Sequence, residues 1–121
     1  MKCFDPTITR SVTLKSKSYL LGDKFYLKNF SDWDENIRDW LAQKENTELT
    51  SEHLIVIEFL RKSYSSNNRH PAVRMVTTEL AKRLGGDKGL VKYFHSLFPG
   101  GIHQAFLIAG LPMMDIAANQ G

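Results

Sequence analysis

The sequence of 121 residues predicts an α+β fold that is mainly α, with an N-terminal β-hairpin or meander packed on about five helices. Three observations lead to this prediction. Apolar residues recur at every second position near the amino terminus and at helical spacing from residue 31 onward. Turn-forming residues divide that second part into pieces of helix length. The composition, 42% hydrophobic and 24% charged, is that of an ordinary globular protein, so most of the chain is expected to fold.

Residues 7–28 are predicted to form strands and turns. Three apolar side chains fall on one face at a two-residue period: Ile8, Val12 and Leu14. Leu21-Gly22-Asp23 is a turn signal, and Phe25-Tyr26-Leu27 is predicted as the last short strand. A sheet this small needs a helical layer over its apolar face.

The first two helices are predicted beyond this sheet. The first has Ser31 or Asp32 as its N-cap, because either side chain can accept a hydrogen bond from an unpaired backbone N–H. Its apolar residues recur at helical spacing: Trp33, Ile37, Trp40 and Leu41. The second helix opens at Thr50 and breaks at residues 65–68. Its all-round apolar character predicts that it is central and buried.

Three further helices complete the predicted fold. Pro71 suits the first turn of the third helix, and Gly85 is placed to end it. The fourth helix, roughly Lys88 to Phe98, is predicted to bury three side chains: Val91, Phe94 and Phe98. The fifth covers Ile102 to Ala109. Residues 1–112 are thus expected to form one domain, followed by a flexible C-terminal tail over residues 113–121.

The third and fourth helices match the pattern of a helix-turn-helix-like hairpin. Ala81 is small enough for two helices to touch, and Gly85 tolerates a positive φ in the turn. Four cations would then be available to DNA phosphates: Lys82, Arg83, Lys88 and Lys92. Residues 88–98 contain no Asn, Gln or Arg to read bases. The pattern therefore leaves open either a DNA-binding regulator or a packing hairpin with solvated lysines.

No catalytic, cofactor or metal motif is recognisable, so we expect a binding protein and not an enzyme. The four histidines lack the spacing of a metal site: His53, His70, His95 and His103. The net charge of +3 permits nucleic acid as a partner without requiring it. The single cysteine, Cys3, and the lack of a signal peptide or a bilayer-length apolar run lead us to expect the cytoplasm and no membrane partner. The oligomeric state stays open.

Five short motifs occur in order between about Tyr26 and Pro112. They are Leu49-Thr50-x-x-His53, Phe59-Leu60-Arg61-x-x-Tyr64, Pro71-Ala72-Val73-Arg74-Met75, Leu97-Phe98-Pro99-x-Gly101 and Ile108-Ala109-Gly110-Leu111-Pro112. Together they resemble the DsrC/TusE family of sulfur-relay proteins, which includes the gamma subunit of dissimilatory sulfite reductase. The resemblance implies a hairpin or meander on about five helices, and a protein partner of the sulfite-reductase or sulfur-relay type. It also matches Arg74 to a family arginine associated with the sulfur-bearing arm, which implies an anion or tail site; surface solvation or an ion pair is the competing interpretation.

The sequence departs from this family at its carboxyl end. Family carriers hold a cysteine beyond the Gly-Leu-Pro motif, and none occurs here between Pro112 and Gly121. A persulfide needs a thiolate, which methionine cannot supply, and Cys3 matches no family position. Within the scaffold, Phe25 stands where a turn glycine is common and Leu54 where tryptophan is usual. We therefore expect a family member with a regulatory or assembly role, and a helix-turn-helix DNA-binding regulator as the alternative.

Overall fold

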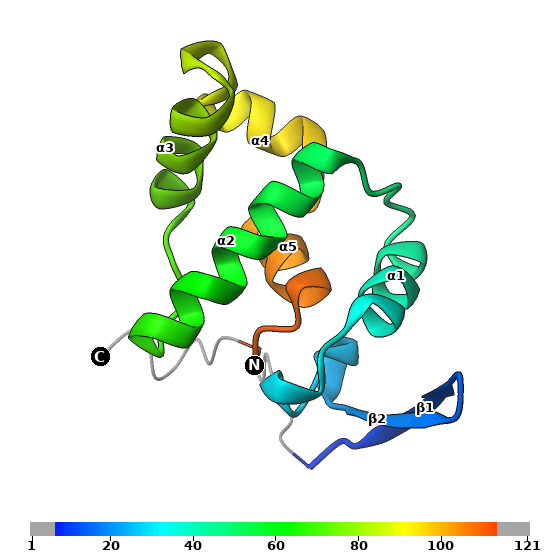
Figure 1. The fold of residues 1–121 in the computed structure, drawn as a ribbon. Helices are drawn as coiled ribbons and strands as arrows, with labels where there is room; N and C mark the ends of the chain where they lie inside the picture. The colour runs from blue at the N-terminus through cyan, green and yellow to red at the C-terminus, as the bar shows by residue number, and fades with distance from the viewer. Residues whose placement is uncertain (1–6, 114–121) are drawn as a thin grey trace.

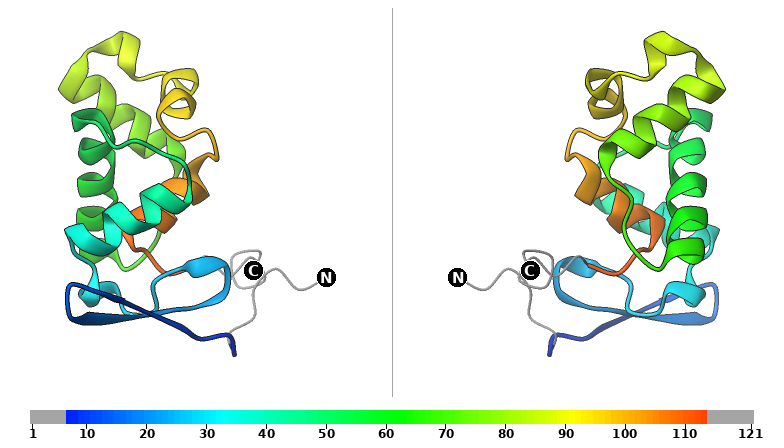
Figure 2. Two further views of the ribbon diagram at one scale, coloured as in Figure 1. Left: turned by 90° about the vertical axis from the view of Figure 1, so that its right-hand side faces the viewer. Right: turned by 90° about the vertical axis from the view of Figure 1, so that its left-hand side faces the viewer.

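The computed structural model describes residues 7–113, in which a two-stranded hairpin lies at one end of a group of five helices (Figure 1). The elements are β1 (Arg10–Leu14), β2 (Lys17–Leu21), α1 (Glu35–Lys44), α2 (Ser51–Asn67), α3 (Val73–Leu84), α4 (Val91–Leu97) and α5 (Ile102–Ala109), with 3-10 turns at Asp23–Phe25, Phe30–Asp32 and Gly86–Lys88. Figure 2 shows the hairpin and the α3–α4 pair at opposite ends of the molecule. The predicted α+β, mainly α class is confirmed.

The hairpin turns at Lys15 and Ser16, a position that the sequence did not predict. Their φ angles of 49° and 71° are those of a type I′ turn, which matches the twist of two antiparallel strands. In β2, Tyr19 and Leu21 are buried, whereas Leu20 between them is 43% exposed. The predicted last strand at Phe25-Tyr26-Leu27 is wrong, because a 3-10 turn ends at Phe25 and only Leu27 bridges back to Leu21.

The N-cap of α1 is Asp34, so the predicted caps Ser31 and Asp32 are wrong. Both predicted residues lie in a 3-10 turn before the helix, where the Asp32 carboxylate accepts a hydrogen bond from Asn29 Nδ2 at 3.2 Å. Asp34 has an extended backbone, and its Oδ1 accepts from the Ile37 N–H at 3.1 Å. The turn inserted before the helix moves the cap along the chain.

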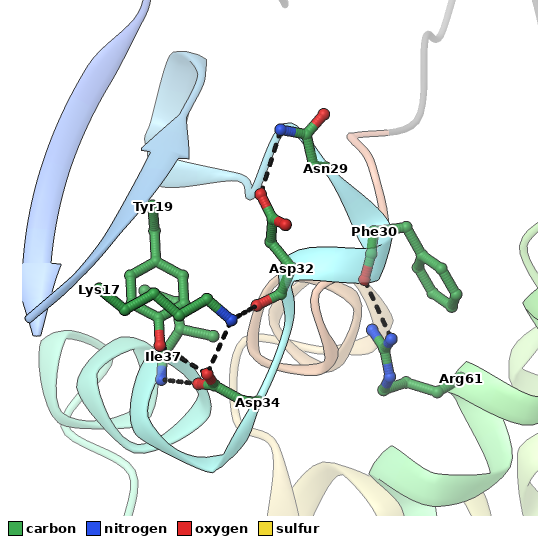
Figure 3. Close-up of polar contacts among 8 residues, drawn as sticks. All are labelled: Lys17, Tyr19, Asn29, Phe30, Asp32, Asp34, Ile37 and Arg61. Carbon is green, nitrogen blue, oxygen red and sulfur yellow. Dashed lines mark hydrogen bonds and ion pairs between the residues drawn. The ribbon is translucent and has the colours of Figure 1, made fainter. Parts of the chain in front are cut away.

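Asp34 also joins the hairpin to α1 (Figure 3). Its Oδ2 accepts hydrogen bonds from the Tyr19 hydroxyl at 2.6 Å and from Lys17 Nζ at 3.1 Å. Burial alone would raise the pKa of Asp34, but the hydrogen bonds from Tyr19, Ile37 and Lys17 outweigh it and lower the pKa to about 2. The hairpin is therefore tied to the helices by a charged group as well as by apolar packing.

The centre of the core is α5, and not α2 as predicted. Every residue from 105 to 111 is buried, and α5 packs against both α1 and α2 (Figure 1). α2 buries a single stripe: His53, Val56, Ile57 and Leu60. Leu54 is 38% exposed, so the prediction that α2 is buried all round is wrong. α5 is short and consists mostly of apolar residues, which is why it can be enclosed on all sides.

The remaining helix ends agree in part with prediction. Thr50 caps α2 as expected, and α5 has the predicted bounds. α2 continues through the predicted break to Asn67, and Asn68, with φ 57°, ends it. α4 begins at Val91, which is 47% exposed, so its predicted burial is wrong. In residues 7–113 no helix is long and apolar enough to cross a membrane; Cys3 and the predicted tail beyond Met113 lie outside the described residues.

Candidate functional site

The candidate site is the carboxyl-terminal junction, defined as residues 108–113, where α5 ends and the chain leaves the core. Carbonyls at a helix C-terminus lack helical partners. Here three side chains from distant segments donate to carbonyls of the junction. Trp33 Nε1 donates to Ile108 O at 3.0 Å, and Arg61 Nη1 donates to Ala109 O at 2.9 Å. His70 Nε2 lies 2.6 Å from Pro112 O.

Arg61 is the centre of this arrangement. Besides Ala109 it donates from Nη2 to Phe30 O at 3.0 Å (Figure 3), and its guanidinium lies 3.9 Å from the Phe30 ring centroid and 4.3 Å from that of Trp33. Both hydrogen-bond acceptors are neutral carbonyls, and no carboxylate of residues 7–113 forms an ion pair with Arg61. Burial lowers the pKa of Arg61 to about 10, so the group remains cationic at neutral pH.

Gly110 is required at the junction by both its backbone and its surroundings. Its φ of 77° is in the left-handed region, and it closes the last turn of α5. A Cβ there would overlap the Trp33 ring and lie 3.2 Å from Arg61 Nη1. The close approach of Trp33 and Arg61 therefore requires a glycine at this position of the Gly-Leu-Pro motif.

The third donor to the junction is His70, in the segment before α3. Trp33, Arg61 and His70 together are called the clamp below. A carbonyl can only accept, so Nε2 carries the proton donated to Pro112. The ring lies edge-on to Tyr64 at 5.4 Å and to Phe106 at 4.8 Å between centroids. Burial lowers the pKa of His70, and the hydrogen bond to Pro112 offsets part of that effect. His70 is therefore held in a mainly aromatic setting that favours its neutral form.

The junction can position the chain but offers no reacting group of its own. The sequence has no cysteine between residues 7 and 113, since Cys3 is the only one in the 121 residues. The described part of the chain also holds no cluster of three or more His, Cys, Asp or Glu side chains that would suit a metal ion. What this geometry accomplishes is to fix the point and direction at which the chain leaves α5.

Arg74, the predicted anion or tail site, lies in the first turn of α3 and is exposed. Its side chain has no hydrogen-bond or ion-pair partner among residues 7–113 and no bond to the junction. The neighbouring Met75 lines a hollow of about 440 Å³ together with His70. Arg74 is thus an exposed cation, unpaired within residues 7–113, and lies four residues after His70.

The four cations predicted for DNA contact are partly neutralised within the molecule. Arg83 pairs with Glu79 at 2.9 Å and with Glu58 at 3.5 Å. Lys88 lies 3.7 Å from a Glu52 carboxylate oxygen. Lys82 and Lys92 are exposed. Gly89 approaches Ala81 so closely that a Cβ would lie 2.5 Å from the alanine methyl, so α3 packs tightly against the turn that leads into α4. Because Arg83 and Lys88 already pair with carboxylates, the DNA-binding hypothesis gains no support.

The sequence analysis did not select Trp33, Arg61 or His70 as site residues. The carbonyls that they bind are 75, 48 and 42 residues away in sequence. One local signal was present, because Arg61 follows Phe59-Leu60 on the inward side of α2. A cation so placed needs acceptors that only the folded chain can provide.

Comparison with known proteins places this architecture among proteins of sulfur metabolism. The family of DsrC-like proteins matches residues 13–114. The sulfurtransferase TusE of Photorhabdus laumondii is 47% identical over 88 residues, which cover 72% of this chain and 79% of that protein. The NMR structure of Allochromatium vinosum DsrC has a TM-score of 0.80 and 39% identity, covering 88% of this chain and 96% of that one. The oxidised gamma subunit of the dissimilatory sulfite reductase from Archaeoglobus fulgidus has a TM-score of 0.80 and 31% identity, with 87% and 96% covered.

Proposed function

This chain belongs to the family of DsrC-like proteins, and from that membership we propose that it binds protein partners of a sulfur-relay or sulfite-reductase system in the cytoplasm without carrying sulfur itself. Its role would be regulatory or in assembly, and not catalytic. The observation that carries the proposal is that His70 holds the chain at Pro112, yet residues 113–121 include no cysteine that could carry sulfur.

The chemistry of sulfur transfer supports this proposal. In a relay protein a cysteine thiolate attacks the sulfane sulfur of a donor persulfide, displaces the donor thiolate and so becomes a persulfide itself. An acceptor thiolate then attacks the outer sulfur of that persulfide and releases the carrier thiolate. The residues after the clamp offer two methionine thioethers, Met113 and Met114, which have no proton to lose and form no persulfide. A protein with the family scaffold and no such thiolate can still occupy the surface to which a carrier binds.

We propose Arg74 as one contact of that surface. It is exposed and has no partner among the described residues. It stands in the first turn of α3, where Ala72 provides no side-chain cap and no acidic residue is present. The partial positive charge of a helix N-terminus adds to that of the guanidinium, which favours an anionic group of a partner. Arg74→Glu should weaken partner capture, whereas Lys82→Glu, the same charge change later in α3, should not.

A sulfur-loading assay tests the central claim. The full chain is incubated with polysulfide, freed of excess reagent and mixed with a thiol acceptor protein, and intact masses are followed before and after reduction. We expect no transfer with turnover. The Cys3→Ser variant is the control, since it removes the only thiol in the sequence. Transfer that requires Cys3 would overturn the proposal, because the protein would then be a carrier through its amino-terminal thiol.

Partner binding is tested separately. Tagged protein is used to capture partners from native extract, and the retained proteins are identified by mass spectrometry. A sulfur-relay or sulfite-reductase component that is retained by the native protein and lost in Arg74→Glu supports the proposal. Failure to retain any such component contradicts it.

A further inference from the structure

Trp33 and Arg61, which hold the junction, also line a hollow in the surface. The hollow measures about 550 Å³ and is lined by α2 and by the segment from Phe30 to Arg38. Its apolar wall consists of Phe30, Trp33, Leu54 and Ile57. Leu54, in the first turn of α2, is 38% exposed and adds its side chain to the apolar surface of the hollow. The hollow therefore presents apolar surface that this chain does not cover within residues 7–113.

The charge around the hollow is mostly positive. Arg61 faces it with hydrogen bonds to carbonyls alone, and Lys62 is exposed with no ion pair in the described chain. Arg38 adds a third cation, which pairs with the adjacent Asp39 at 2.9 Å. The one carboxylate of the lining, Glu58, is 71% exposed and lies 3.5 Å from Arg83 of α3. Arg61 and Lys62 thus retain donors for an incoming anion.

These features complement one kind of occupant. From the hollow we propose that it receives a segment of a partner protein in which a carboxylate side chain lies next to a bulky apolar one. The carboxylate would bind Arg61 and Lys62, and the apolar side chain would pack on Leu54 and Phe30. This inference rests on the proposed function, because it names the chemistry of the partner. The Arg61 guanidinium lies against two aromatic rings and is held by two hydrogen bonds, so it loses little freedom when it binds a carboxylate.

A protein segment suits the hollow better than a small molecule. Leu54 and Lys62 are both exposed and lie two turns apart on α2, so an occupant can extend along the helix surface. Acidic and apolar side chains at neighbouring positions of a helix or extended segment reproduce the pattern of the hollow. The partner segment is therefore expected to be acidic and amphipathic.

Fluorescence anisotropy tests this inference. The probe is a fluorescein-labelled peptide of alternating leucine and glutamate, titrated with the full chain at low salt, and the control is a leucine–glutamine peptide. Lys62→Glu should weaken binding of the acidic peptide roughly three- to tenfold, as expected for a charge change at a partly exposed contact. Leu54→Asp should weaken it at least as much. Lys92→Glu, the same charge change on α4, should alter it less than about twofold.

Three outcomes would overturn the inference: no binding of the acidic peptide, equal binding of the glutamine peptide, or equal weakening by Lys92→Glu and Lys62→Glu. The side-chain donors to the junction are Trp33, Arg61 and His70, which both variants keep, and circular dichroism checks that both variants fold. Capture from native extract separates this inference from the proposed function. If the native chain retains a sulfur-relay partner and Leu54→Asp retains it equally, only the present inference fails. If the native chain retains none, the proposed function fails, and the peptide titration alone decides the chemistry of the hollow.

Discussion

The carboxyl-terminal junction and the α3–α4 hairpin use arginine in opposite ways. Arg61, which holds the junction from α2, is half-buried, lies against two aromatic rings and binds only backbone carbonyls. In the hairpin, Arg83 is exposed and pairs with the carboxylates of Glu79 and Glu58. Each arginine has one adjacent lysine in the sequence, Lys62 after Arg61 and Lys82 before Arg83, so the local pattern of cations does not distinguish the two. Cation density along a chain therefore says little about which cation organises a structure; burial and the nature of the acceptors decide it.

Glycine shows the same contrast. Gly110 in the junction has a positive φ and touches Trp33, so two independent constraints exclude a side chain. Gly89 in the α3–α4 hairpin is constrained by its close approach to Ala81 and to the Thr77 carbonyl oxygen, but its φ of −94° is one that any residue adopts. Gly86, three residues before Gly89, has nothing within 4 Å of an added Cβ. The junction is the more tightly specified of the two regions, and the following predictions test that difference.

The largest effect is expected at Gly110. Gly110→Ala adds a methyl group that overlaps the Trp33 ring on a backbone with φ 77°, and it should reduce the free energy of unfolding by about 3 kcal/mol. Urea denaturation followed by circular dichroism measures the change. Gly86→Ala is the matched control and should stay within about 0.5 kcal/mol of the native protein. Equal losses in the two variants would show that the junction is no more constrained than the hairpin turn.

The two arginines should differ by the next largest amount. Arg61→Met removes hydrogen bonds to Ala109 and Phe30 and leaves both carbonyls without that partner, so unfolding should become easier by about 2 kcal/mol. Arg83→Met removes only exposed, solvent-screened ion pairs and should leave the midpoint of urea denaturation nearly unchanged. Urea denaturation of both variants at one pH and salt concentration measures the two effects. The comparison breaks down if Arg83→Met is the more harmful substitution.

The clamp by His70 predicts a pH dependence. Burial keeps the pKa of His70 in the folded protein below its ordinary value of 6.5, so below that pH the unfolded chain binds more protons than the folded one. Stability from this group is complete above about pH 6.5 and is lost as the pH falls through the lower folded-state pKa. Unfolding free energies at several pH values, measured for the native protein and for His70→Phe, check this. The variant keeps an aromatic ring but cannot titrate, so an unchanged pH profile would contradict the assignment to His70.

The smallest effect is expected at Lys88, in the turn between α3 and α4. Lys88 and Glu52 are each about one-third exposed and 3.7 Å apart, so their coupling in a double-mutant cycle with Lys88→Gln and Glu52→Gln should be below about 0.5 kcal/mol. Raising the salt concentration should reduce it further. Urea denaturation of the four proteins of the cycle gives the coupling energy. A coupling above about 1 kcal/mol would contradict the expectation that exposed ion pairs contribute little to the α3–α4 hairpin.

The predictions that held depend on neighbours in sequence. Thr50 caps α2 because its hydroxyl reaches the N–H of His53 three residues later, and Gly85 ends α3 because it adopts a φ of 112° at little cost. The predictions that failed depend on distant segments. The cap of α1 is Asp34 and not Ser31 or Asp32, and its carboxylate also binds Lys17 and Tyr19 of the β1–β2 hairpin. Likewise Val91 belongs to an apolar stripe in the sequence, but it is the first residue of α4 and is 47% exposed.

By itself the sequence determined the mainly α class with its amino-terminal hairpin, the motifs of the family and the position of its single cysteine. These are matters of periodicity, local hydrogen bonding and residue identity. Only the tertiary structure decided that Trp33, Arg61 and His70 hold the carboxyl-terminal junction, and that Arg61 also lines a hollow with unpaired cationic surface. The physical reason is that a donor and its carbonyl acceptor separated by 42 to 75 residues meet only when the helices between them have packed.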